Sequence, residues 1–388
     1  MSPRTGDTRP GGRARGSHIP AKLISEAVTA QASRIRDIAA FIHAHPELAF
    51  EEHQCAGYLA TVLQQAGLHV ERGVGGMATA FKATVAGAHS GRKLGLVAVY
   101  DAVPTVVPDG TMAAIHSCGH GRQAAGVAGA ALALADLADQ LAGSVVVLGL
   151  PADETMAPAA SARGGGKEIS VKEGLWEGLD VALYAHPEFV DAVLLASLWM
   201  RQDQAIIIGR RSLVDQSAQD TLEAVRAALR RVRAATSQRL ILERAQFRGN
   251  VEEGCQLTLD FRLFAGDESG LVNLAQHLRA ELPEAIWRER RIVPSIRSDD
   301  SVRTAVASAM AEAGRACAAA PPALPHATDF GYISRAMPAA LIGLGRDGGW
   351  AMHAEEGAAQ FAGAEGEAVG LAIAQVLAFA CSRLSEEA

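Results

Sequence analysis

Apolar residues along the chain change from helical spacing to short continuous runs. Residues 20–44 place apolar side chains three or four positions apart, and residues 51–66 repeat this spacing before Gly67, a residue type that commonly ends helices. Three apolar runs of strand length follow, and a long Ala-rich segment lies between the first two; the runs are residues 94–100, 144–150 and 180–185, and the segment is 123–141. Continuous apolar runs are typical of strands that are buried on both faces of a parallel sheet. The pattern predicts an α/β domain with a mainly parallel central sheet flanked by helices.

The pattern changes between residues 192 and 297. There it predicts strands that pair through short turns and two amphipathic helices: strands at 197–209, 239–247 and 254–264, and helices at 215–235 and 268–282. Buried-helix and strand patterns then return at 302–320, 339–344 and 360–382. We therefore expect residues 192–297 to form an inserted α+β sandwich domain, and residues 20–191 and 298–388 to form the large domain. Residues 1–19 are rich in Arg, Gly and Pro and are expected to be a disordered tail.

Polar side chains follow each predicted strand of the large domain. Asp101 follows the first strand, the pair Asp153 and Glu154 follows the second, and His186 follows the third. Cys118 and His120 open the helical segment, and His353 comes after the strand at 339–344. Open α/β folds bind ligands at the carboxyl ends of their strands, so these side chains are expected to meet at one edge of the sheet.

These residue types suit a metal site, although each has a simpler explanation. A thiolate and an imidazole two residues apart can hold one borderline-soft divalent ion, or two ions close together. The alternative is a buried free Cys118 beside a His120 that caps a turn. In the adjacent pair Asp153 and Glu154, one carboxylate could bind a metal while the other transfers a proton. The alternative is that the pair lies in a solvated turn. A lone loop histidine such as His353 is more often exposed to solvent than bound to a metal, and only the neighbouring ligands change that expectation.

Composition restricts the class of protein. The 388 residues are 49% hydrophobic, which allows large cores and two domains, and the net charge of −7 argues against nucleic acid as a partner. The tail carries no apolar core long enough for a signal peptide or a membrane span, so no membrane partner is expected. The five cysteines are few and widely scattered, which favours a reducing, cytoplasmic compartment over a disulfide framework.

The order of the motifs resembles one known family over nearly the whole chain from about residue 20. The blocks are VYDAVP, HSCGH, PADE with GGGK downstream, YAHP, TDFG and a late His, with an insert domain before TDFG. This order resembles the zinc aminoacylase and carboxypeptidase family of metallopeptidases. Within it, the chain is most similar to the amidohydrolase branch that contains aminobenzoyl-glutamate hydrolase and the indole-acetyl amino acid hydrolases.

The resemblance implies a set of residue roles. The implied ligands of one or two Zn²⁺ or Mn²⁺ ions per subunit are Cys118, His120, Glu154, His186 and His353. Asp101 would orient these ligands, and Asp153 would take a proton from the attacking water and pass it to the leaving amine. Asn250 and Arg262 would contact the substrate, a small molecule with an N-acyl amino acid or dipeptide-like amide bond. The insert would act as a lid and form a homodimer.

Four departures from the family pattern leave the chemistry open. Asp153 stands where the family has a longer glutamate, and Gly121 replaces an Asp or Asn. Residues 155–162 are an insertion expected to push the glycine loop away from the carboxylates, and residues 210–214 lack a histidine that the family carries there. Three functions remain: a working amidohydrolase, an enzyme recruited to another amide or C–N bond reaction including bond formation, and a non-catalytic binding or regulatory protein. The sequence names no substrate.

Overall fold

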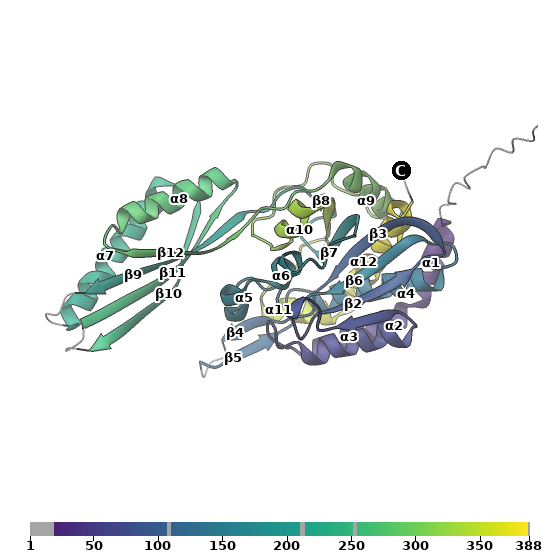
Figure 1. The fold of residues 1–388 in the computed structure, drawn as a ribbon, viewed down its shortest axis with the longest axis horizontal. Coiled ribbons are helices and arrows are strands. Elements are labelled where there is room, and N and C mark those ends of the chain that lie inside the picture. Colours follow the sequence, from purple (N-terminus) through teal and green to yellow (C-terminus); the bar gives the residue numbers. More distant parts are fainter. Residues whose placement is uncertain (1–18, 107–109, 210–213, 251–253, 387–388) are drawn as a thin grey trace, which may run out of the picture.

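The chain folds around two separate β-sheets (Figure 1). The structure is a computed structural model, and it describes residues 19–106, 110–209, 214–250 and 254–386. The tail expected at residues 1–19 therefore lies almost wholly outside the described residues. In Figure 1 the second sheet and its two helices form a lobe beside the larger one, which holds the chain's C-terminus.

The large sheet has seven strands. In spatial order they are β1 (His69–Arg72), β2 (Phe81–Ala86), β6 (Ala142–Gly149), β3 (His89–Ala98), β7 (Val181–Pro187), β13 (Ala339–Leu344) and β8 (Ala192–Leu194). The four strands β6, β3, β7 and β13 run parallel, whereas β1, β2 and β8 add antiparallel edges. The apolar runs are buried on both sides because alternate residues enter two different cores, Leu94 and Leu96 one core and Val97 and Val99 the other. The mainly parallel sheet predicted from the sequence is confirmed.

Helices cover both faces of this sheet. One core contains residues of α1 (Ala21–Ala30), α2 (Ala32–Ala44), α3 (His53–Gln65), α4 (His120–Asp136), α9 (Asp300–Glu312) and α12 (Ala364–Leu384). The other core is lined by α6 (Gly166–Lys172) and α10 (Phe330–Ala336). Gly126 lets α4 approach α12 closely, since a Cβ there would lie 2.6 Å from the Ile373 side chain. Among the described residues, α12 alone is long and apolar enough to cross a membrane, and 72% of its apolar window is buried inside the fold.

The second sheet is antiparallel and has four strands. Their order is β10 (Arg239–Asn250), β11 (Gly254–Ala265), β9 (Trp199–Gly209) and β12 (Ile286–Val293). The amphipathic helices α7 (Val214–Ala235) and α8 (Glu268–Glu281) share one apolar core with it, and this core includes Leu257, Leu259 and Phe261. The separate α+β unit expected from the sequence is therefore present.

Several boundaries differ from the sequence prediction. Strand β8, assigned to the insert, pairs with β13 in the large sheet, so the second sheet begins at Trp199. The helix expected at 20–44 is split because Gln31 makes a tight turn, with its N–H bonded to Val28 O, and its side chain donates to Asp136 Oδ2 at 2.7 Å. The pattern also missed β1, β2 and β12, together with a hairpin of β4 (Val103–Val106) and β5 (Met112–Ile115).

Candidate metal and catalytic site

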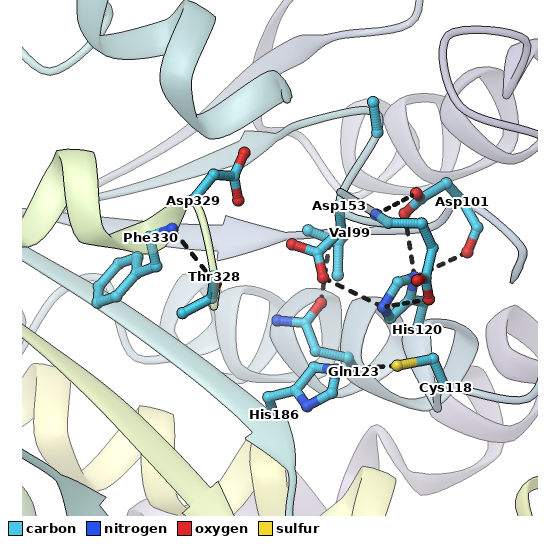
Figure 2. Close-up of polar contacts among 12 residues, drawn as sticks. Val99, Asp101, Cys118, His120, Gln123, Asp153, His186, Thr328, Asp329 and Phe330 are labelled. Carbon is cyan, nitrogen blue, oxygen red and sulfur yellow. Dashed lines mark hydrogen bonds and ion pairs between the residues drawn. The ribbon is translucent and has the colours of Figure 1, made fainter. Parts of the chain in front are cut away.

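The side chains predicted from the strand ends lie together at the carboxyl edge of the parallel strands. Asp101 comes shortly after β3, Asp153 and Glu154 follow β6, and His186 lies at the end of β7. Helix α4 begins at His120, three residues earlier than predicted, so its first residue points into the same region. Figure 2 shows Asp101, Cys118, His120, Asp153 and His186 gathered around one centre.

Asp101 fixes the orientation of His120. The His120 Nδ1 lies 2.7 Å from the Asp101 carbonyl oxygen and 3.0 Å from Asp101 Oδ1, and the other carboxylate oxygen accepts the Glu154 N–H at 2.8 Å. With Nδ1 engaged, His120 Nε2 faces Asp153 Oδ2 at 3.2 Å (Figure 2). The same nitrogen lies 3.8 Å from Glu154 Oε1. This arrangement leaves the lone pair of Nε2 available to a ligand in the centre.

Cys118 lies between three histidines. Its Sγ is 3.8 Å from His186 Nε2 and 3.4 Å from His353 Nε2, and the same His353 nitrogen lies 3.5 Å from Glu154 Oε1. Two triads with ligand atoms within 4.8 Å of one another share this cysteine: Cys118, His120 and His186, and Cys118, Glu154 and His353. Each triad could hold a metal ion.

Electrostatics in this centre favour a bound cation. Burial would raise the pKa of the Cys118 thiol, but contacts with His120, His186 and His353 lower it well below its usual range. Burial and the neighbouring Cys118 raise the pKa of Glu154 to about 8. Moreover, His120 Nε2 and Glu154 Oε1 are buried without a hydrogen-bond partner. A thiolate, imidazoles and a carboxylate with unpartnered donor atoms fit a divalent ion.

The backbone at the site has positive φ angles that tight local packing supports. Gly119 has φ 84°, and a Cβ there would lie 2.8 Å from Phe361 and Pro187, so only glycine fits. Ala152, directly before the acidic pair, has φ 59°, and its N–H donates to the buried Glu52 Oε1 at 2.9 Å. Glu52 therefore holds the turn that presents Asp153 and Glu154, a role that nothing in the sequence pattern indicated.

Two further side chains, besides His120, hold Asp153. Lys167, only 1% exposed, forms an ion pair with Asp153 and another with Asp329 Oδ1 at 2.7 Å, and the Tyr184 hydroxyl donates to Asp153 Oδ2 at 3.1 Å. The prediction that the insertion displaces the glycine loop is wrong, since Lys167 belongs to that loop. The loop returns to the carboxylates because the Gly166 N–H bonds to Pro151 O.

The inserted residues instead form α5 (Pro158–Arg163), which contacts the second sheet. There the Arg262 guanidinium, fully buried, binds both Glu243 oxygens at 2.8 Å, Thr155 O at 3.0 Å and Ser161 Oγ at 2.5 Å. In this structure protein groups therefore engage the Arg262 guanidinium, and the substrate contact expected from the sequence stays a prediction. Asn250 ends β10, and its side chain lies outside the described part of the chain, as do residues 210–213, where the family's histidine is missing.

A cavity of about 490 Å³ opens beside the cluster. Its polar lining includes the five side chains Cys118, Asp153, Glu154, His186 and His353, and also His326, Glu188 and Arg239, which the sequence pattern did not indicate. The volume lies within the usual range of small-molecule sites, about 300–1,000 Å³. The sequence did hold a signal for three other residues near the site, because Lys167, Tyr184 and Asp329 belong to the GGGK, YAHP and TDFG blocks. No such motif marks Arg239.

Comparison with known proteins places the chain among metallopeptidases. The family model described as peptidase family M20/M25/M40 matches residues 95–363, well over half of the chain. One of the subunits of the Escherichia coli p-aminobenzoyl-glutamate hydrolase is 34% identical over 181 residues, which are 43% of this chain and 35% of that protein. The N-acyl-L-amino acid amidohydrolase of Geobacillus stearothermophilus is 30% identical over 153 residues, 37% of this chain and 38% of that one. The matched part thus spans little more than a third of these relatives.

Solved structures share the whole fold. A Bacillus subtilis protein described as a dinuclear metal binding peptidase from the M20 family superposes with a TM-score of 0.66 at 18% identity, covering 92% of this chain and 99% of that one. The aminobenzoyl-glutamate utilization protein of Klebsiella pneumoniae gives a TM-score of 0.64 at 14% identity, covering 92% and 98%. Together with the family model, this agreement confirms the resemblance noted in the motif order: the chain belongs to peptidase family M20/M25/M40.

Proposed function

We propose that this protein is a metal-dependent amidohydrolase that cleaves the amide bond of an N-acyl amino acid or a dipeptide-like substrate. The observation that carries the proposal is the convergence of five donor side chains with an adjacent carboxylate, Asp153, at the edge of a cavity of about 490 Å³. The names of the relatives, which include an N-acyl-L-amino acid amidohydrolase, support this class of substrate.

We propose that one or two ions are held by Cys118, His120, Glu154, His186 and His353. Zinc suits this set because it prefers thiolate and imidazole ligands, and manganese is the alternative when carboxylate oxygen dominates. The two triads that share Cys118 support a site for two ions. A divalent ion bound there polarises an amide carbonyl and lowers the pKa of a water molecule.

The chain's own side chains supply the proton transfer and the positioning. Asp153 accepts the proton of the attacking water and donates it to the leaving nitrogen, a role worth roughly 10²- to 10⁴-fold. Lys167 and Tyr184 fix its carboxylate through the ion pair and hydrogen bond described above. Asp101 holds His120 through Nδ1 and so keeps Nε2 turned toward the centre.

The test is hydrolysis of a panel of N-acyl amino acids and dipeptides with added zinc or manganese. We expect turnover by the unsubstituted protein, and a loss of ~10²-fold or more in kcat with unchanged metal content in Asp153→Asn. Asp37→Asn, a change of an exposed carboxylate on α2, serves as the control and should retain full activity. Absence of hydrolysis across the panel with either metal would contradict the proposal.

Asp153→Glu separates a working amidohydrolase from an enzyme recruited to another reaction. Restoring the longer side chain of the family should raise hydrolysis of simple acyl amino acids if the native protein has been tuned to a different amide or C–N bond. A shift of about 1 Å at such a position changes rates by on the order of 100-fold. Unchanged or lower activity in Asp153→Glu favours hydrolysis as the native reaction.

We also propose a homodimer formed through the inserted domain of residues 192–297, and a cytoplasmic location. The free Cys55, Cys317 and Cys381 support a reducing compartment. The acidic net charge of −7 supports a small molecule rather than nucleic acid as the ligand.

A further inference from the structure

The cavity beside the donor cluster has two chemically different walls. The wall on the large domain carries the metal-binding side chains and the acidic groups Asp153 and Glu188. The opposite wall is formed by Arg239, Ile241 and Phe264 of the second sheet. A substrate that enters this cavity is therefore in contact with both domains of the same chain.

Arg239 is the one lysine or arginine among the described residues that line this cavity. Its side chain is exposed, and its guanidinium lies 5.5 Å from the centre of the Phe264 ring. Within the described part of the chain no carboxylate forms an ion pair with it. By contrast, Arg244 and Arg262 on the same two strands are bound to Asp260 and Glu243.

Strand register explains why this cation faces the cavity. Arg239 is the first residue of β10 and lies directly opposite Phe264 of β11, and Ile241 is two residues further along β10. Residues two apart on a strand share a face, and directly opposed residues of an antiparallel pair do too. Arg239, Ile241 and Phe264 therefore form one patch with a charged end and an apolar surface.

Arg262, another arginine of this face, is engaged by Glu243 and by the inserted segment. Arg262 lies opposite Ile241, two residues before Phe264, but Thr155 and Ser161 cover its guanidinium and accept its hydrogen bonds. An insertion that occupies Arg262 leaves Arg239 as the available guanidinium on this part of the sheet. A guanidinium suits a planar carboxylate because it can donate two parallel hydrogen bonds.

We propose that Arg239 binds the free carboxylate of the substrate and makes it a specificity determinant of the site, with Ile241 and Phe264 contacting the adjoining apolar side chain. This inference rests on the proposed function for the identity of the substrate. The binding preference that it predicts is measured separately from turnover. The remaining acidic groups of the cavity repel a carboxylate, so Arg239 is what makes an anionic ligand acceptable at this end.

The experiment compares binding of N-acetyl-L-leucine and its uncharged analogue N-acetyl-L-leucinamide by calorimetry. The full-length chain is used, loaded with zinc, in the Asp153→Asn form so that the ligands persist. We expect the carboxylate to bind about 10-fold more tightly than the amide, as for a charge-assisted hydrogen bond. Arg239→Gln should reduce this preference to less than about twofold while leaving the affinity for the amide unchanged, and added salt should weaken the preference in the arginine form.

Arg230→Gln is the matched control, since Arg230 is an exposed arginine on α7 that does not line the cavity. It should retain the preference. A preference that survives Arg239→Gln, or that is absent before the substitution, overturns the assignment of Arg239. If Arg239 controls carboxylate binding but no acyl amino acid is hydrolysed by the unsubstituted protein, the proposed reaction fails and the binding assignment stands.

Discussion

Replacement of Lys167 by methionine is expected to destabilise the large domain strongly. Lys167 is 1% exposed and is the ion-pair partner of both Asp153 and Asp329, the latter at 2.7 Å with a fully buried carboxylate. Methionine matches the length of the lysine stem but leaves two neighbouring carboxylates without their cation. Breaking a buried ion pair from one side costs about 3–5 kcal/mol, because an uncompensated charge remains in a medium of low polarity.

Lys172→Met provides a matched control on the same helix, α6. Lys172 also pairs with a carboxylate, Glu168 Oε1 at 2.6 Å, but its own side chain is 61% exposed. Removing this exposed ammonium should cost about 0–1 kcal/mol, because water solvates it and the buried Glu168 keeps its second partner, Arg291, at 2.6 Å. The two substitutions thus remove the same side chain from the same helix and differ mainly in burial.

The assay is urea and thermal unfolding followed by circular dichroism, with a chelator present so that metal binding does not add to stability. For a domain of this size, 3–5 kcal/mol corresponds to a decrease in Tm of roughly 6–20 °C. Adding Asp329→Asn to Lys167→Met should recover part of the loss, because one unpaired charge is removed. A loss below about 1 kcal/mol, or one equal to that of Lys172→Met, would refute the buried ion-pair network.

Three further outcomes concern the metal ligands, a helix cap and the oligomeric state. Cys118→Ala and His353→Ala should each lower the bound zinc measured by elemental analysis, whereas Cys317→Ala, outside the cluster, should not; equal metal content in all three would contradict the ligand assignment. Asp299 caps α9, and hydrogen bonds from Ser301 and the Val302 N–H lower its pKa, so its stabilising effect is present above the unfolded pKa of about 3.9 and is lost as pH falls through the lower folded value. Asp299→Ala should therefore cost about 1 kcal/mol in urea unfolding at pH 7 and progressively less below about pH 4, and a cost independent of pH would contradict this account. Light scattering should give twice the chain mass of 40.4 kDa for this chain and a monomer for a form without residues 199–293, the second sheet and its helices; a dimer in the truncated form would place the interface elsewhere.

The large sheet and the approximate place of the candidate metal ligands follow from the sequence alone. Buried parallel strands have continuous apolar runs, and the residues that follow them must meet at one edge of the sheet. The positions of Cys118, Glu154 and His186 relative to the predicted strands were therefore enough to bring these residues near one another. His353 depended on the motif order, because a long loop separates it from its strand and loop geometry has no periodic signal.

Which partners the surrounding side chains contact depends on tertiary structure that the sequence does not reveal. The ion pair of Lys167 with Asp329 joins residues 162 positions apart in the sequence, and spacing carries no information about such a contact. In the same way, Arg262 and Arg239 are both arginines on neighbouring strands, and nothing in the chain distinguishes them. The fold does so by packing Thr155 and Ser161 over Arg262 while Arg239 faces the cavity. Local patterns fix secondary structure because its periodicity is local, whereas burial and charge pairing depend on which distant segments come into contact.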